Sequence, residues 1–172
     1  MNKVCFLDRD GVLNADTGYV FDWSRTSLLT YNVKIISQLM RQDYRFCIIT
    51  NQSGIGRGYF NLEQYHCFMI ELKRRLKELK VNIDAEYYCP HVESDKCTCR
   101  KPNNGMFEQA FKEKSYLRCD SIMIGDRESD MQAAGKSQVR HRFLLNESGV
   151  IYKGQGNNAT YYDNLEIAFR VI

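Results

Sequence analysis

A short apolar run, Val4-Cys5-Phe6-Leu7, is followed at once by Asp8-Arg9-Asp10-Gly11. An uninterrupted apolar run of this length is typical of a strand that is buried on both faces, as in a parallel sheet. Residues two apart in an extended chain point to the same side, so Asp8 and Asp10 face one reaction centre. The stretch therefore predicts a buried strand that ends in a pair of carboxylates.

Four further short runs fit the same pattern. Two are strong, Phe46–Ile49 before Thr50-Asn51-Gln52 and Ile122–Ile124 before Gly125-Asp126, and two are weaker, Tyr87-Tyr88 and Phe143–Leu145. Ligands of parallel sheets bind beyond the carboxyl ends of the strands. Because each strong run ends in carboxylates or in hydroxyl and amide side chains, we expect the active site at that edge of the sheet.

Stretches with helical spacing separate these runs. The apolar positions are Val33, Ile36, Leu39 and Met40 in one stretch, and Leu62, Tyr65, Met69, Leu72, Leu76 and Leu79 in the next, which Asn61 and Gln64 can cap. Further helices are expected from about Met106 and Ser129. This alternation predicts an α/β fold with three layers, a Rossmann-like parallel sheet flanked by helices. We expect a single domain over residues 1–172 with a minimal cap, since no insertion is long enough for a lid.

The composition fits an ordinary folded protein, with 172 residues, 44% of them hydrophobic, 26% charged, and a net charge of +3. This charge is too small to indicate nucleic-acid binding, although it favours an anionic substrate. The first apolar run, Val4–Leu7, meets the charge of Asp8 after four residues, so it is neither a signal peptide nor a membrane span. No other stretch is long enough to span a bilayer. We expect a cytoplasmic monomer that binds neither nucleic acid nor membrane.

The seven cysteines are unevenly distributed. Cys89, Cys97 and Cys99 crowd with His91, whereas Cys5, Cys47, Cys67 and Cys119 stand alone and are expected to be small buried hydrophobes. Three thiolates and an imidazole match a closed tetrahedral zinc site in a reducing compartment, while a disulfide pair would suit a secreted protein. With every position filled by protein, the zinc would organise the loop that leads into Arg100 and Lys101 rather than perform chemistry.

Two carboxylates as close as Asp8 and Asp10 resist ionising together, so either a cation binds them or one stays protonated. Taken alone, the motif fits a polar turn as well as a catalytic pair. Thr50, Lys101 and Asp126, with Asp130 nearby, supply a hydroxyl, an ammonium group and further carboxylates in positions that the pair would need. In its residues and in their order, this series resembles the haloacid dehalogenase superfamily of phosphatases.

The resemblance implies roles for these residues. Asp8 would attack the phosphoryl group, and Asp10 would protonate the leaving alcohol and later activate water. Mg²⁺ would be held by Asp8, the backbone carbonyl of Asp10 and Asp126. Thr50 and Lys101 would bind phosphoryl oxygens, and Asp130 would orient Lys101 or the metal waters.

The cysteine loop narrows the resemblance to a zinc-bearing branch that includes heptose bisphosphate and histidinol-phosphate phosphatases. Three segments are more similar to the heptose bisphosphate enzymes, namely residues 16–20, 50–58 and 105–106. This similarity implies a small phosphorylated sugar as substrate and a role in making a bacterial surface polysaccharide. The positions implied to contact it are Asp16, Thr17, Gly18, Tyr19, Asn51, Gln52, Ser53, Arg57, Arg100 and Arg127. The short spacing from His91 to Cys97, and Arg127 where a lysine is usual, look more like histidinol-phosphate phosphatase, so both substrates stay open.

A rival hypothesis from another class is a zinc-ribbon module that binds nucleic acid or protein. The cysteine loop and the mild basicity favour it. It leaves Asp8, Asp10, Thr50 and Asp126 without a role, and the phosphatase hypothesis accounts for all four.

Overall fold

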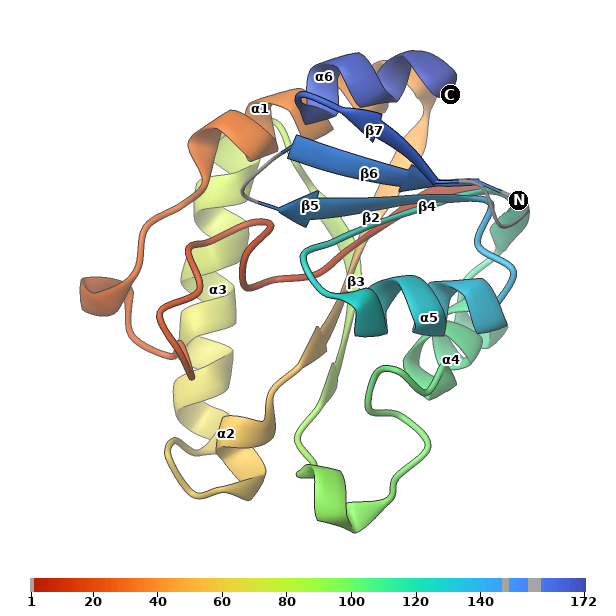
Figure 1. Cartoon of the computed structure of the whole chain (residues 1–172). Coiled ribbons are helices and arrows are strands. Elements are labelled where there is room, and N and C mark those ends of the chain that lie inside the picture. Colours follow the sequence, from red (N-terminus) through yellow and green to blue (C-terminus); the bar gives the residue numbers. More distant parts are fainter. Residues whose placement is uncertain (1, 147–148, 155–158) are drawn as a thin grey trace.

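The computed structural model describes residues 2–146, 149–154 and 159–172. Within these residues, one sheet runs in the order β3-β2-β1-β4-β5-β6-β7 (Figure 1). The strands are β1 Asn2–Leu7, β2 Tyr44–Asn51, β3 Ile83–Cys89, β4 Tyr116–Gly125, β5 His141–Asn146, β6 Gly149–Lys153 and β7 Ala159–Tyr162. The strand β1 is central and pairs in parallel with β2 and β4, so the ends of these three strands meet at one edge.

Six α-helices and four short 3₁₀ helices accompany the strands among the described residues. The α-helices are α1 Thr30–Ser37, α2 Ser53–Gly56, α3 Leu62–Glu78, α4 Gly105–Glu113, α5 Glu128–Lys136 and α6 Leu165–Ala168. The 3₁₀ helices are η1 Trp23–Arg25, η2 Gln38–Gln42, η3 Glu93–Asp95 and η4 Phe169–Val171. Asn61 caps α3 and forms a reciprocal capping box with Gln64, as the sequence predicts.

Alternate residues of β1 belong to two different cores, which makes the fold three-layered. Cys5 and Leu7 pack with α1, α3 and α6 on one face of the sheet. Val4 and Phe6 pack with α4 and α5 on the other face (Figure 1). All four side chains are 0% exposed. This pattern explains why the run is apolar without interruption, and it confirms the predicted fold class.

All five predicted strands are present, and the parallel pairings extend from β3 to β5. The prediction missed β6 and β7, which pair antiparallel at the edge of the sheet. Val150-Ile151-Tyr152 in β6 is a short apolar run that the prediction passed over, whereas β7 is exposed or only partly buried along its length. The sheet is therefore mixed, with its parallel part around the predicted site.

Two of the isolated cysteines do not lie in the core. Cys5 and Cys47 are buried, but Cys67 and Cys119 are exposed, so the expectation that all four are buried hydrophobes was wrong for these two. Cys119 stands between Arg118 and Asp120, whereas Cys67 begins the apolar run Cys67–Ile70 but lies on the exposed side of α3. Among the described residues, no helix is both long and apolar enough to cross a membrane.

Candidate active site

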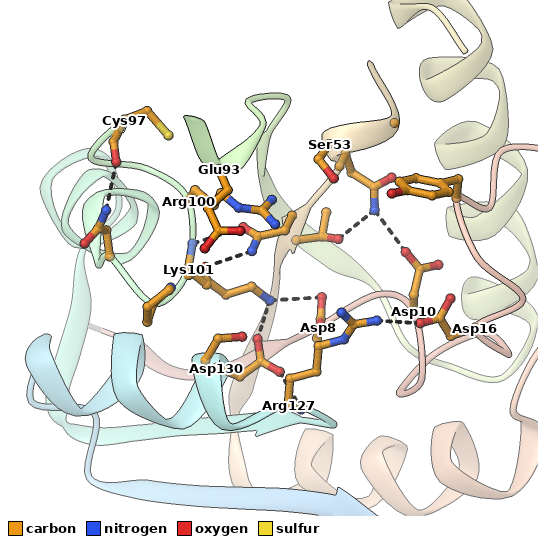
Figure 2. Close-up of a pocket in the computed structure, with 18 of the residues that line it drawn as sticks. Asp8, Asp10, Asp16, Ser53, Glu93, Cys97, Arg100, Lys101, Arg127 and Asp130 are labelled. Carbon is orange, nitrogen blue, oxygen red and sulfur yellow. Dashed lines mark hydrogen bonds and ion pairs between the residues drawn. The ribbon is translucent and has the colours of Figure 1, made fainter. Parts of the chain in front are cut away.

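A cavity of about 630 Å³ opens at the carboxyl edge of the parallel strands. Its walls come from the segments that follow β1, β2, β3 and β4, which are distant in sequence (Figure 2). Nearly all predicted site residues outside the zinc loop line this cavity. Those lining it are Asp8, Asp10, Asp16, Gly18, Tyr19, Thr50, Asn51, Gln52, Ser53, Arg57, Arg100, Lys101 and Arg127.

Asp8, Lys101 and Asp130 form a buried ion-paired cluster at the floor of the cavity (Figure 2). Nζ of Lys101 lies 3.1 Å from Oδ1 of Asp8 and 2.5 Å from Oδ1 of Asp130. The same nitrogen donates a hydrogen bond of 2.8 Å to the carbonyl of Ile49. The exposed fractions of Asp8, Lys101 and Asp130 are 7%, 3% and 0%. A single ammonium group therefore joins a carboxylate that follows β1 to one in α5.

Burial sets the electrostatics of this cluster. It raises the pKa of Asp8 to about 7, against the lowering effect of Lys101 and with further raising by neighbouring carboxylates. Burial on its own lowers the pKa of Lys101, but Asp130 and Asp8 outweigh it and the net shift is upward. Lys101 therefore stays charged at neutral pH. Asp8 is only partly ionised there, and a further positive charge nearby would favour its full ionisation.

Asp126 completes a group of carboxylates that could hold a cation. Oxygens of Asp8, Asp126 and Asp130 all lie within 4.8 Å of one another. Oδ1 of Asp126 is buried and has no hydrogen-bond partner among the described residues. Burial, then the charge of Asp130, raises the pKa of Asp126 to about 6. Three oxygen ligands with an unsatisfied acceptor suit Mg²⁺, which prefers oxygen and keeps several waters.

Two glycines make room for these carboxylates. A Cβ added to Gly11, whose φ is +78°, would lie 2.2 Å from Oδ2 of Asp126. A Cβ added to Gly125 would lie 2.4 Å from Oδ2 of Asp130. Gly11 thus lets the segment after β1 approach the end of β4 closely, and Gly125 makes room for Asp130 of the following helix.

The carboxylate of Asp10 lies apart from the Lys101 cluster and is held by four hydrogen bonds. Arg9 donates from Nε at 3.1 Å and from Nη2 at 2.9 Å, Asn14 donates at 2.8 Å and Gln52 at 3.0 Å. Figure 2 shows Asp8 between Lys101 and Asp10. Sequence reasoning missed Arg9 and Asn14, which have no recognisable spacing of their own. Arg9 is 0% exposed, with its guanidinium 4.7 Å from the ring centre of Phe68.

The side chains at the end of β2 contact different partners. Asn51 is bound to the backbone of Lys101: its Oδ1 accepts from the amide nitrogen at 3.0 Å, and its Nδ2 donates to the carbonyl at 3.0 Å. This pair of contacts fixes residue 101 against the end of β2. Thr50 is 1% exposed and accepts a hydrogen bond from Gln52. The resemblance implied that Asn51 contacts the substrate. In the structure its side chain contacts the backbone of Lys101.

Asp16 and Arg127 form an ion pair of 2.8 Å across the mouth of the cavity (Figure 2). Asp16 comes from the segment after β1 and Arg127 from the segment after β4. Thr17 is not among the residues lining the cavity, because its hydroxyl donates to the carbonyl of Arg25 at 3.0 Å. The structure thus brings together Asp16 and its neighbours Gly18 and Tyr19, but not Thr17.

Positive charge gathers on the walls of the cavity. Arg57, Arg100 and Arg127 line it, together with Lys96, which the sequence did not single out. Glu93, also unforeseen, comes from the same loop as Lys96. These two residues lie between predicted zinc ligands, so ligand spacing alone gave no signal for a role in the cavity. The loop after β3 is accordingly one wall of the site (Figure 2).

The four predicted zinc ligands meet in space. Sγ of Cys99 lies 3.2 Å from Sγ of Cys89, 3.5 Å from Sγ of Cys97 and 3.2 Å from Nδ1 of His91. All four ligand atoms lie within 4.8 Å of one another. A disulfide requires sulfurs about 2.05 Å apart, so these thiols are free. Three sulfurs and one imidazole nitrogen suit a structural zinc ion with no open position.

A mainly parallel α/β sheet whose carboxyl edge gathers an aspartate pair, a lysine and a Gly-Asp turn is the arrangement of haloacid dehalogenase-type phosphatases. Residues 6–154 match the family described as polynucleotide kinase 3 phosphatase, and the chain belongs to this family. The matched range contains every residue named above as part of the cavity or of the cysteine loop. The resemblance seen in the sequence is confirmed.

Curated proteins similar in sequence to this chain include heptose bisphosphate phosphatases. D-glycero-beta-D-manno-heptose-1,7-bisphosphate 7-phosphatase of Haemophilus influenzae is 37% identical over 168 residues, covering 94% of this chain and 91% of the relative. D-glycero-alpha-D-manno-heptose-1,7-bisphosphate 7-phosphatase of Photorhabdus laumondii is 39% identical over 173 residues, covering 95% and 92%. The relatives thus include enzymes named for both anomers.

A solved structure gives the same picture. The D,D-heptose 1,7-bisphosphate phosphatase from B. bronchiseptica, complexed with magnesium and phosphate, aligns with a TM-score of 0.76 and 30% identity. The alignment covers 83% of this chain and 79% of that chain. That similar enzyme therefore holds magnesium and phosphate on a closely matching fold.

Proposed function

We propose that the chain is a Mg²⁺-dependent phosphatase that hydrolyses one phosphate ester of D-glycero-D-manno-heptose 1,7-bisphosphate. The observation that carries the proposal is the cluster in which Lys101 joins Asp8 and Asp130, with Asp126 beside them. The identity of the sugar is inferred from the names of the relatives. The product would serve as a heptose precursor for a bacterial surface polysaccharide.

In this proposal Asp8 is the nucleophile. Its Oδ1 accepts a hydrogen bond of 2.8 Å from the amide of Arg9 and pairs with Lys101, whereas its Oδ2 has no hydrogen bond among the described residues. Oδ2 is therefore the oxygen placed to attack phosphorus, while the bond from phosphorus to the sugar oxygen breaks. Lys101 and the hydroxyl of Thr50 then bind phosphoryl oxygens, whose negative charge grows in the transition state.

Asp10 is the proposed acid and base. It gives a proton to the departing sugar oxygen and takes one from the water that cleaves the aspartyl phosphate on Asp8. Its contacts with Arg9, Asn14 and Gln52 hold it on one side of Asp8, away from Lys101. Asp10 and Lys101 are thereby assigned to opposite sides of the nucleophile.

Asp8, Asp126 and the backbone carbonyl of Asp10 are the proposed ligands of Mg²⁺. The unpartnered buried Oδ1 of Asp126 supports this assignment. Bound there, Mg²⁺ would neutralise negative charge on the phosphoryl group and the carboxylates. Asp130 is assigned to Lys101, to which it is ion-paired. A zinc ion in the cysteine loop would fix the wall that carries Lys96 and Arg100.

The remaining arginines are proposed to bind the rest of the substrate. Arg57, Arg100 and Arg127 line the cavity, and a guanidinium binds a phosphate through two parallel hydrogen bonds. A bisphosphate would offer a second phosphate to this wall. The ion pair between Arg127 and Asp16 is exposed and therefore weak, so Arg127 would exchange it for a contact with that phosphate.

A substrate panel tests this proposal. We expect phosphate release with Mg²⁺ from the α- or β-anomer of heptose bisphosphate at a kcat/KM at least about tenfold above that for histidinol phosphate. A preference for histidinol phosphate would overturn the sugar and leave the mechanism standing. Binding to nucleic acid without turnover of any phosphate ester would favour the zinc-ribbon hypothesis.

Binding of Mg²⁺ should depend on pH. Because burial raises the pKa of Asp8 to about 7 and of Asp126 to about 6, protons compete with the metal below neutrality. Affinity should therefore fall as pH falls, by roughly tenfold or more between pH 8 and pH 6, with protons released on binding at pH 7. Titration calorimetry in buffers of different ionisation enthalpy measures both quantities. Equal dissociation constants at the two pH values would contradict the proposed ligands.

A further inference from the structure

The side-chain amide of Gln52 lies between two groups of the proposed mechanism. Its Nε2 donates a hydrogen bond of 2.8 Å to Oγ1 of Thr50 and one of 3.0 Å to Oδ2 of Asp10. Gln52 is 3% exposed although it lines the cavity. A buried amide thus connects the phosphate-binding hydroxyl at the end of β2 with the acid and base after β1.

The direction of this amide follows from its neighbours. Oδ2 of Asp10 also accepts from Nη2 of Arg9, so the nitrogen of the amide, which donates, faces Asp10, and its oxygen does not. The backbone of Gln52 is also fixed, since its N–H donates to the carbonyl of Cys89 at 2.7 Å and its carbonyl accepts from Ile55 at 3.1 Å. Side chain and main chain together hold the amide in one place.

The contact with Thr50 has a chemical consequence. A hydroxyl oxygen that accepts a hydrogen bond still has its own hydrogen to donate. Among the described residues, no acceptor takes the hydroxyl hydrogen of Thr50, whose oxygen accepts from Gln52. With the amide occupying one side of the oxygen, that hydrogen is directed to the other side. A phosphoryl oxygen in the cavity is the acceptor that would satisfy it.

The contact with Asp10 differs from the other three that hold this carboxylate. Arg9 and Asn14 belong to the same short segment as Asp10, whereas Gln52 is 42 residues away in sequence. Gln52 therefore sets the position of Asp10 relative to β2 and not only relative to its own loop. Both hydrogens of Nε2 are used in these two bonds, so none is left to donate to a sugar hydroxyl.

We propose that Gln52 is a positioning residue, which directs the hydroxyl of Thr50 to the phosphoryl group and fixes Asp10 beside the nucleophile. This inference rests on the proposed phosphatase function. It replaces the contact with substrate that the resemblance implied for Gln52.

The test is a double-mutant cycle with Gln52→Met and Thr50→Val. Methionine keeps the length of the side chain without its hydrogen bonds, and valine keeps the shape of threonine. We expect Gln52→Met to lower kcat about tenfold or more while KM changes by less than about threefold. The affinity for inorganic phosphate should weaken about fivefold on Gln52→Met in the wild-type background, and less than twofold in the Thr50→Val background.

Several results would overturn the inference. A raised KM with unchanged kcat would identify Gln52 as a direct substrate ligand, and equal weakening of phosphate binding in both backgrounds would show that it does not act through Thr50. Gln132→Met, on the exposed face of α5, is the matched control and should change neither quantity. If Gln52→Met unfolds, Gln52→Glu keeps the shape and should give the same loss of kcat. A wild-type protein without phosphatase activity would reject the proposed function, and the phosphate-binding cycle would still test Gln52.

Discussion

Asp8→Asn is expected to reduce phosphate release by at least about a thousandfold, because it removes the oxygen that attacks phosphorus. The substitution preserves the shape of the side chain. Its amide oxygen can still accept from the amide of Arg9, as Oδ1 of Asp8 does at 2.8 Å. The fold should therefore survive, and the loss should appear in kcat. Steady-state kinetics with Mg²⁺, together with thermal unfolding, measures both effects.

Asp43→Asn provides the matched control for this experiment. Asp43 is exposed and has a φ of 63°, a conformation that asparagine also adopts readily. Activity should stay within about twofold of wild type in this variant. If Asp8→Asn retained more than about a tenth of the wild-type rate, Asp8 could not be the nucleophile.

The second large effect is expected from the cysteine loop. Cys97→Ala should abolish stoichiometric zinc binding, lower the midpoint of thermal unfolding and reduce kcat about tenfold or more. With one of four ligands removed, the remaining thiols of Cys89 and Cys99 and the ring of His91 cannot close the site. Zinc content by elemental analysis, unfolding and kinetics check the three parts. Cys67→Ala, at an exposed cysteine outside the cluster, should change none of them.

The loss of activity follows from how the loop is connected. Cys99 precedes Lys101 by only two residues, and the carbonyl of Cys97 accepts a hydrogen bond of 2.8 Å from Asn103. On the other side, Asn51 holds the backbone of Lys101 from the end of β2. A disordered loop would remove the support of Lys101 on the cysteine side and leave its backbone held only from the side of β2. Full activity in a metal-stripped but folded protein would contradict this coupling.

The sequence predicted the catalytic edge well because its signals are local. Each of the strong strands is an uninterrupted apolar run, and the two faces of β1 belong to separate cores, which is what such a run requires. The ligands of the cysteine loop are close in sequence, so their spacing indicated a cluster that the structure assembles. The edge of the sheet was predicted less well, because the short run Val150–Tyr152 of β6 was passed over and β7 is exposed or only partly buried.

Other parts of the site could not be predicted, because they depend on contacts between distant segments. The two hydrogen bonds from Asn51 to residue 101 join positions 50 residues apart. The burial of Arg9 under Phe68 depends on how α3 packs against the sheet. Resemblance indicated that Asn51 and Gln52 belong to the site. The hydrogen bonds of Asn51 and Gln52 in the structure show that these two side chains hold other residues of the site in place. The sequence alone does not separate such residues from those that only line the cavity.

The most direct test of the account is a search for the covalent intermediate on Asp8. Wild-type protein mixed with heptose bisphosphate and Mg²⁺ is quenched in acid within one turnover, and borohydride then reduces any aspartyl phosphate to homoserine for detection by mass spectrometry. We expect homoserine at position 8 of the wild-type protein, and none in Asp8→Asn or with Mg²⁺ chelated. Homoserine at another aspartate, or turnover at the wild-type rate with position 8 unchanged, would contradict it.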